Sequence, residues 1–383
     1  MNSLVLDVGT TNIKAFIFNK SFDIVSSYSK EIPKQTAGDK AEQNPNEILQ
    51  ISVEVIKGVI AESKIDVMSI VGLGMTVQRE TIIVWNKKTG EPVYPAILWE
   101  DNRTLKWCED LKKTSEQFVR EKTGLSVLPY FSSSKLAWIF KHVGYSEDLI
   151  WGTVDTWIMW NLLSEKPHVT DYTNASRTML FNLKNLSWDS NLFDLWGITN
   201  TNAPQIKPSL SLFGTLNESI VGAKIPLVAV CGDQQGSMYG AIKKGVHTKI
   251  TFGTGTFLVQ ALESGFTNIA DFFTTLLPTK DGASYALEAK IGEYGQIVAD
   301  LRKQKISLEN ITKEIADSVK PWIEKLPTMP KDIVVDGGIT QSPFLLSALR
   351  AVVPNVNFWE QTTFEGTALG VANMVFDSVE GRE

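Results

Sequence analysis

The segment LVLDVGTT (residues 4–11) joins a short apolar run to a turn of glycine and threonine, and a second apolar run, AFIF (15–18), follows it. The segment ITFGTGT (250–256), continued by FLV (257–259), repeats this arrangement much later in the chain. Two apolar runs joined by a short glycine turn are typical of a β-hairpin. Two matched hairpins so far apart suggest two related halves that face a common ligand.

Such turns suit phosphate. Glycine lets the main chain approach an anion closely, and successive backbone N–H groups form an anion-binding concavity. Threonine hydroxyls add donors, and Asp7 can hold a magnesium ion through water. One turn alone is weak evidence, because hairpins of every function use glycine and threonine. A third glycine turn, in IVVDGGIT (333–340), leads into a helical stretch over 344–352.

The rest of the chain alternates strand and helix patterns, which predicts an α/β fold with mixed or parallel sheets. Apolar spacing predicts a helix over about 46–62 and another over 311–323, kinked or ended by Pro321. The apolar run IPLVAVC (225–231) predicts a buried strand. We place a domain boundary just before it, which gives domains 1–224 and 225–383 packed around a cleft.

The composition fits an ordinary enzyme of 383 residues with a net charge of −6, and this charge argues against a nucleic-acid binder. Cys108 and Cys231 are too few for a disulfide framework, and the three histidines lie too far apart to predict a metal site. The start of the sequence lacks a signal-peptide pattern, and no apolar run is long enough to span a membrane. We therefore expect a cytoplasmic protein.

Several longer segments carry a family resemblance: VQRET (77–81), VWNK (84–87), WEDNRT (99–104), YFS (130–132) with Lys135, Trp138 and His142, GTVDTW (152–157), DYTNASR (171–177), GDQQ (232–235) and FGTG (252–255). In these segments the chain resembles the FGGY carbohydrate kinases, and among them the glycerol kinases most. The resemblance covers residues 4 to about 300 and resumes from about 309 to 374. It implies two ribonuclease-H-like domains of the actin and hexokinase superfamily that close over ATP.

The activity that the resemblance implies is ATP-dependent phosphorylation of a small polyol, with glycerol and glycerol 3-phosphate as the expected substrate and product. Asp233 is then the general base that accepts the proton of the attacking hydroxyl. From the residues alone, a helix N-cap is an equal interpretation of Asp233. Likewise, Arg79 and Glu80 could form a structural ion pair, or could grip vicinal hydroxyls as donor and acceptor. The resemblance favours hydrogen bonds to the polyol from Arg79, Glu80, Tyr130, Asp233 and Gln234, with Trp99 and Phe257 as its apolar wall.

On the nucleotide side, the resemblance places the β- and γ-phosphates against Gly9, Thr10, Thr11, Asn12 and Thr254. Asp7 organises Mg2+, and Gly337 and Gly338 approach the adenine and ribose. Lys14 stands where many relatives have arginine, so it keeps the charge and loses the bidentate fork. The expected partners are thus ATP, Mg2+ and a small polyol or sugar, with a homodimer left open and neither nucleic acid nor a membrane expected.

The family resemblance is incomplete in the second half of the chain. After Arg302 the chain lacks a family segment that carries a Pro-, Trp- and Gly-rich block and the second family signature, so the C-terminal domain is trimmed. Ser342-Pro343 follows where the family usually has an asparagine near adenine. A polyol-binding protein with weak or no kinase activity is therefore an alternative to an active enzyme. Glu100 and Asn102, where glycerol kinases often have glutamine and arginine, leave another polyol or a ketose as a further alternative acceptor.

Overall fold

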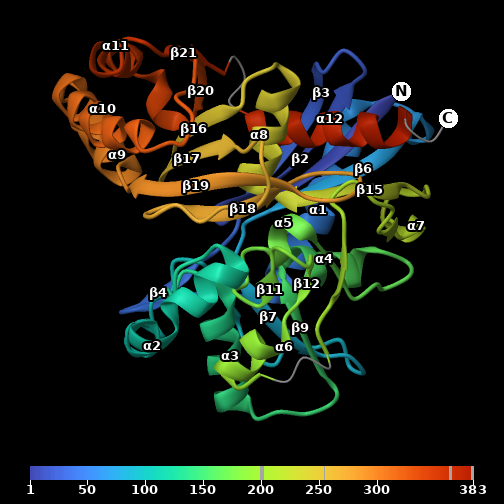
Figure 1. The fold of residues 1–383 in the computed structure, drawn as a ribbon. Helices are drawn as coiled ribbons and strands as arrows, with labels where there is room; N and C mark the ends of the chain where they lie inside the picture. Colours follow the sequence, from blue (N-terminus) through green and yellow to red (C-terminus); the bar gives the residue numbers. More distant parts are fainter. Residues whose placement is uncertain (199–201, 254, 362–364, 381–383) are drawn as a thin grey trace.

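The computed structural model describes residues 1–198, 202–253, 255–361 and 365–380 (Figure 1). Strands and helices alternate along the chain in a mixed α/β arrangement, which confirms the predicted fold class. Two six-stranded sheets form the upper part of the molecule in Figure 1, and a smaller sheet with its own helices lies below them. Among the described helices, none has the length and apolar character needed to cross a bilayer.

The first sheet contains the first predicted hairpin, and its two strands pair antiparallel with Asp7 opposite Lys14. Both β6 and β15 run parallel to β1, so the carboxyl ends of three strands reach the same edge of the sheet. In spatial order the strands are β14 (Gly214–Thr215), β15 (Pro226–Gly232), β6 (Ile70–Val77), β1 (Asn2–Val8), β2 (Asn12–Asn19) and β3 (Ile24–Glu31).

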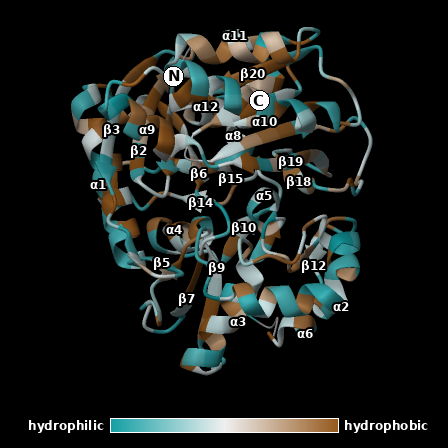
Figure 2. Ribbon diagram, turned by 90° about the vertical axis from the view of Figure 1, so that its left-hand side faces the viewer, coloured by the Kyte–Doolittle hydropathy of each residue, from teal (hydrophilic) through white to brown (hydrophobic). Residues whose placement is uncertain are grey.

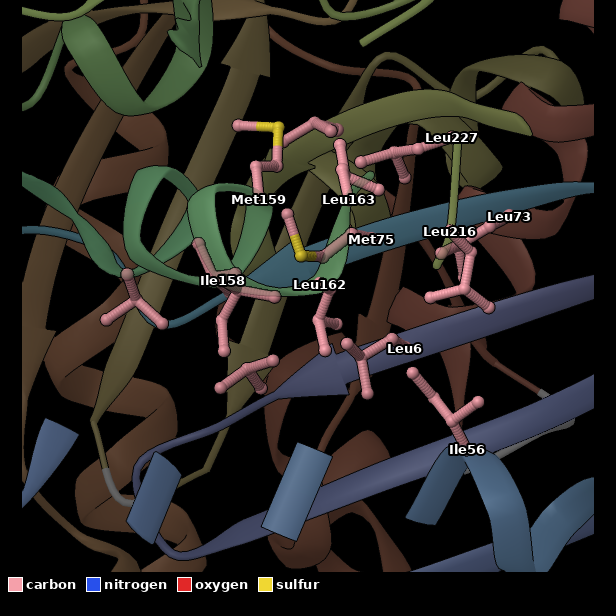
Figure 3. Close-up of a cluster of buried hydrophobic side chains, with 14 of the residues drawn as sticks. Leu6, Ile56, Leu73, Met75, Ile158, Met159, Leu162, Leu163, Leu216 and Leu227 are labelled. Carbon is pink, nitrogen blue, oxygen red and sulfur yellow. The ribbon is translucent and has the colours of Figure 1, made fainter. Parts of the chain in front are cut away.

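One face of this sheet packs against α1 (Pro45–Ser63) and α4 (Val154–Leu162). Figure 3 shows the contact, in which Leu6 and Met75 of the strands lie with Ile56 of α1 and Ile158 of α4. The predicted helix over 46–62 is confirmed, and the Asn44 side chain caps it by accepting from the N–H of Asn46. This packed layer holds the carboxyl ends of the strands rigidly. Two short helices, η1 (Val67–Ser69) and α7 (Glu218–Val221), complete this part.

The second sheet contains the second predicted hairpin, also antiparallel. Its strands follow the order β18 (Phe273–Leu277), β19 (Ser284–Gly292), β17 (Thr256–Ala261), β16 (Thr248–Phe252), β20 (Asp332–Asp336) and β21 (Asn357–Glu360). Its helices are α9 (Gly295–Lys303), α10 (Glu309–Glu324), η2 (Gly338–Gln341) and α11 (Pro343–Val352). Only residues 304–308 separate α9 from α10.

Helix α10 confirms the predicted helix over 311–323 and runs through Pro321 to Glu324, so this proline does not end the helix, whereas a kink there stays a prediction. Pro321 lies in the last turn, where its missing N–H leaves the carbonyl oxygen of Asp317 without its helical donor and its ring crowds that carbonyl. The buried Val319 and Ile323 flank it and hold that turn against the core. Tertiary packing therefore outweighs the local effect of proline here.

Helices α8 (Asp233–Lys243) and α12 (Gly366–Glu380) cross where the two sheets meet (Figure 1). They touch through glycines, since a Cβ at Gly370 would lie 1.9 Å from the carbonyl oxygen of Gly236. Helix α12 then packs against β6, β1 and β15 of the first sheet. The division expected at residue 224 falls between β14 and β15, which pair with each other in the first sheet, and it stays a prediction.

The lower part contains α2 (Leu105–Thr123), α3 (Ser132–Val143), α5 (Tyr172–Ala175) and α6 (Ser190–Trp196). Its five-stranded sheet has the order β4 (Gln35–Ala37), β5 (Lys40–Gln43), β8 (Ala96–Ile97), β7 (Ile82–Asn86) and β9 (Leu149–Thr153). Two-stranded sheets join β10 (Val169–Asp171) to β13 (Gln205–Lys207) and β11 (Phe181–Asn182) to β12 (Ser187–Trp188). Figure 2 shows β7 as hydrophobic in the interior and α2 as largely hydrophilic at the outside.

Candidate functional site

The first glycine turn is tight. The N–H of Gly9 donates to the carbonyl oxygen of Asn12 at 3.1 Å, and a Cβ on Gly9 would lie 2.8 Å from that same oxygen. Glycine is therefore required for the turn to close. The turn carries Thr10 and Thr11 to the wall of a cavity at the edge where β1, β6 and β15 end.

This cavity has a volume of about 250 Å³. The second glycine turn lines it from the opposite sheet through Gly253 and Gly255, so both predicted hairpins face one space. Thr254, predicted to contact phosphate, lies outside the described residues. The structure brings all seven predicted acceptor residues to the cavity wall: Arg79, Glu80, Trp99, Tyr130, Asp233, Gln234 and Phe257.

Asp233 occupies the junction between β15 and α8. Gly232 is the N-cap and Asp233 is the first helical residue, so its carboxylate does not serve as the N-cap of α8. Oδ1 accepts from the N–H of Gln234 at 2.7 Å. The side chain is 41% exposed because it faces the cavity, yet it sits deep in the cleft. Burial raises the pKa of this carboxyl, while the neighbouring Arg79 opposes the increase. A carboxylate so placed can accept a proton from a ligand in the cavity.

An aromatic wall bounds the cavity. The rings of Trp99 and Tyr130 meet edge to face at 5.8 Å, and Trp99 Nε1 donates to Oγ1 of Thr10 at 3.0 Å. This bond ties the aromatic wall to the first glycine turn. On the other side, a Cβ at Gly255 would lie 2.7 Å from the Phe257 ring. Apolar walls with a few convergent polar groups are typical of small-molecule sites.

Arg79 and Glu80 each find a partner elsewhere in the chain. Arg79 Nη1 and Nη2 donate to the two carboxylate oxygens of Glu288, at 2.6 and 3.1 Å, whereas its Nε lies 3.9 Å from Glu80. Glu80 instead accepts from Nε of Arg177 at 2.6 Å. Glu80 also has a φ of 62°, a strained value for a non-glycine residue.

Sequence reasoning missed two members of this charge cluster. It quoted Arg177 only as part of the DYTNASR motif, and it did not single out Glu288. The available signal for Glu288 was its position in the otherwise apolar run YALEA (285–289), where an acidic residue in a strand interior is unusual.

Asp7 lies near the carboxyl end of β1, two residues before Gly9 of the first glycine turn. Burial raises the pKa of its carboxyl to about 7, with Lys14 opposing and Asp233 and Glu365 adding to the increase. The described residues contain no group of three or more metal-binding side chains. Magnesium in nucleotide sites usually needs only one or two carboxylates together with the phosphates, and the desolvated Asp7 carboxylate fits that requirement.

Gly337 lies beside the second glycine turn. Its φ is 97°, and a Cβ there would lie 2.4 Å from the carbonyl oxygen of Phe252. Gly338 is exposed, and its carbonyl oxygen accepts from Arg302 at 3.0 Å. Next to them, the buried Lys249 and Asp336 form an ion pair of 2.7 Å. Both predicted adenine-side glycines thus lie at the edge of the second sheet, outside the lining of the acceptor cavity.

Comparison with known proteins places this arrangement in a class. The model for the N-terminal domain of the FGGY family of carbohydrate kinases matches residues 3–240. Glycerol kinase from Bacillus licheniformis is 40% identical over 312 residues, which is 78% of this chain and 63% of the relative. Glycerol kinase from Caldanaerobacter subterraneus is 40% identical over 322 residues, 80% of this chain and 64% of the relative. The chain thus spans less than two thirds of the length of these relatives.

Solved structures agree on the fold. A Plasmodium falciparum glycerol kinase with ADP has a TM-score of 0.89 at 24% identity, covering 99% of this chain and 90% of that one. A xylulose kinase from Lactobacillus acidophilus has a TM-score of 0.83 at 20% identity, covering 100% and 90%. The chain therefore shares the fold of these two kinases. The chain belongs to the FGGY family of carbohydrate kinases.

Proposed function

We propose that this protein transfers the γ-phosphoryl group of ATP to a hydroxyl of a small polyol, and that the polyol is glycerol and the product glycerol 3-phosphate. The observation that carries the proposal is one cavity that both glycine turns line together with the seven side chains predicted to contact the polyol. Its size suits a small acceptor beside a phosphate. The glycerol kinases among the similar proteins support the choice of glycerol.

Asp233 is the general base in this proposal. Its carboxylate takes the proton of the acceptor hydroxyl while the oxygen attacks the γ-phosphorus, and the bond to the bridging oxygen of ADP breaks. Arg79, Glu80, Tyr130 and Gln234 hold the other hydroxyls. Trp99 and Phe257 cover the carbon chain and exclude water from the transfer.

The nucleotide phosphates lie against the first turn, at Gly9, Thr10, Thr11 and Asn12, with Lys14, Thr254, Gly337 and Gly338 completing the nucleotide site. Magnesium, held through Asp7 and the phosphates, supplies charge neutralisation. The cytoplasmic location and a homodimer stay predictions.

A different acceptor is the second candidate. Lys34 and Glu100 both line the cavity and form an ion pair of 2.7 Å. A longer polyol or a ketose has additional hydroxyls that these two charged groups could bind. This pair is the specific reason to test other acceptors.

A coupled assay of ADP release from ATP and magnesium tests the proposal, with and without glycerol and with a panel of polyols and ketoses. Glycerol-dependent release supports it. A ketose preferred over glycerol by tenfold or more would move the acceptor to the second candidate. Glycerol binding by calorimetry without any release would indicate a polyol-binding protein rather than a kinase.

A further inference from the structure

Five charged side chains meet at and behind the wall of the acceptor cavity, and four of them are almost fully buried. Arg79, Glu80, Arg177 and Glu288 are each at most 3% exposed, and Asp233 faces the cavity. Arg79, Glu80 and Asp233 follow strands of the first sheet, whereas Arg177 follows α5 of the lower part. Glu288 comes from β19 of the second sheet, so it alone of the five crosses between the two sheets.

Glu288 determines how Arg79 is oriented. It receives both forked ends of the guanidinium, Nη1 at 2.6 Å and Nη2 at 3.1 Å. The bidentate geometry fixes the plane of the guanidinium group. With the fork engaged, Nε is the part of Arg79 that faces Asp233, at 3.2 Å from Oδ1. Arg79 therefore meets the candidate base through one side-on contact rather than through its fork.

Glu288 also fixes Arg177. Its Oε1 accepts from Nη2 of Arg177 at 2.9 Å, while Nε of Arg177 donates to Glu80 at 2.6 Å. The guanidinium lies against the ring of Phe131, 5.0 Å from its centroid. Its buried Nη1 has no hydrogen-bond partner in the described part of the chain. Glu288 is thus the carboxylate that both arginines share.

The backbone beneath Glu288 is rigid. Strand β19 is an interior strand, and Glu288 pairs with Val259 on one side and with Phe273 on the other. A side chain on such a strand holds its position better than one on a loop. Burial disfavours the charge on Glu288, but Arg177 and Arg79 outweigh burial and hold its pKa below the ordinary range.

We propose that Glu288 is a positioning residue of the acceptor site, which orients Arg79 toward Asp233 and Arg177 toward Glu80 from the opposite sheet. The proposal rests on the proposed function, because it assigns Glu288 a role in phosphoryl transfer. Without the Glu288 carboxylate, the fork of Arg79 becomes free to turn to Asp233. A bidentate contact there would lower the proton affinity of the base and make it a poorer proton acceptor.

The test is Glu288→Gln, which removes the charge and keeps the size. We expect kcat to fall on the order of 10²-fold with a smaller change in the KM for the acceptor, because the groups that act in the transition state are misplaced. The acid limb of the pH–rate profile should move to lower pH. Glu293→Gln, an exposed carboxylate just beyond the same strand, is the matched control and should change kcat by roughly twofold or less.

A buried charge change can also prevent folding. The double variant Glu288→Gln/Arg177→Gln removes one charge of each sign, so the cluster keeps its net charge. We therefore expect this variant to fold. If Glu288 orients Arg79, the variant keeps both the loss of kcat and the shift of the acid limb. Recovery of wild-type kcat and pH dependence in the double variant would overturn the proposal, as would unchanged kinetics in Glu288→Gln.

A measurement without turnover separates this proposal from the proposed function. The carboxyl carbon of Asp233 can be followed by ¹³C NMR as the pH is changed, with the signal assigned by its absence in Asp233→Asn. We expect a lower titration midpoint in Glu288→Gln than in the wild type. If the wild type phosphorylates no acceptor, the proposed function fails, whereas an unchanged midpoint overturns the positioning role of Glu288.

Discussion

Lys14 donates to both carboxylate oxygens of Glu365, at 2.9 and 3.1 Å, although 351 positions separate them in the sequence. The contact joins β2, just beyond the phosphate turn, to the residue before α12. It means that Lys14, which follows the first turn in the sequence, is already paired with a carboxylate. An incoming phosphate must therefore compete with Glu365 for Lys14.

Opposite changes in ATP affinity should follow from altering the two partners of this pair. Lys14→Met should raise the KM for ATP about tenfold, because a hydrogen bond to a charged group is lost. Glu365→Gln should lower it, because the lysine is released toward the phosphates. Initial rates of ADP release at varied ATP measure both. An increase in both variants would mean that the pair acts structurally and that Lys14 does not bind phosphate.

Asp233→Asn should abolish turnover and leave polyol binding largely in place, since a general base acts mainly in the transition state. A loss of 10²- to 10⁴-fold in kcat is the usual scale for such a group. Calorimetry with glycerol measures binding separately from the rate. Asp110→Asn, an exposed carboxylate on α2, is the control that should keep full activity. Equal losses of binding and rate would make Asp233 a ground-state or structural group.

Much of this site could be predicted from the sequence because its parts are local. The turn at Gly9 and the strand before Asp233 each follow from a few adjacent residues. The partners of Arg79 and Lys14 could not be predicted in this way. Glu288 reaches Arg79 through the strand order of the second sheet, and Glu365 reaches Lys14 because α12 packs against the first sheet. The continuation of α10 past Pro321 could not be predicted for a related reason, because it depends on the core that this helix covers.

Binding of magnesium and ATP should release protons near neutral pH. The pKa of Asp7 is raised to about 7, so at pH 7 about half of the molecules carry a protonated Asp7 that must ionise to bind the cation. The release should grow as the pH falls toward 6 and vanish above about 8.5. Calorimetry in buffers of different ionisation enthalpy measures it, and Asp7→Asn should show none. The same proton release in Asp7→Asn would assign it to another group.

Gly370→Ala should destabilise the protein strongly. The added Cβ would lie 1.9 Å from the carbonyl oxygen of Gly236, where two helix backbones touch and neither can yield easily. Overpacking of this kind costs about 1–3 kcal/mol or more. Urea unfolding measures the change, and Gly265→Ala, with no atom within 4 Å of the new Cβ, is the matched control. Equal stability of the two variants would show that the helices can move apart at little cost.

Closure of the two halves should accompany ligand binding, because both glycine turns line one cavity from different sheets. A ligand that contacts both turns gains more when the sheets approach each other, so its binding energy favours the closed form. Solution X-ray scattering of Asp233→Asn with glycerol, ATP and magnesium avoids turnover and should give a smaller radius of gyration than the free protein. Glycerol alone, which need not contact the first glycine turn, should produce a smaller decrease in the radius of gyration. An unchanged curve with all ligands bound would mean that the cavity is already in its closed form, and that the chain binds its substrates without domain motion.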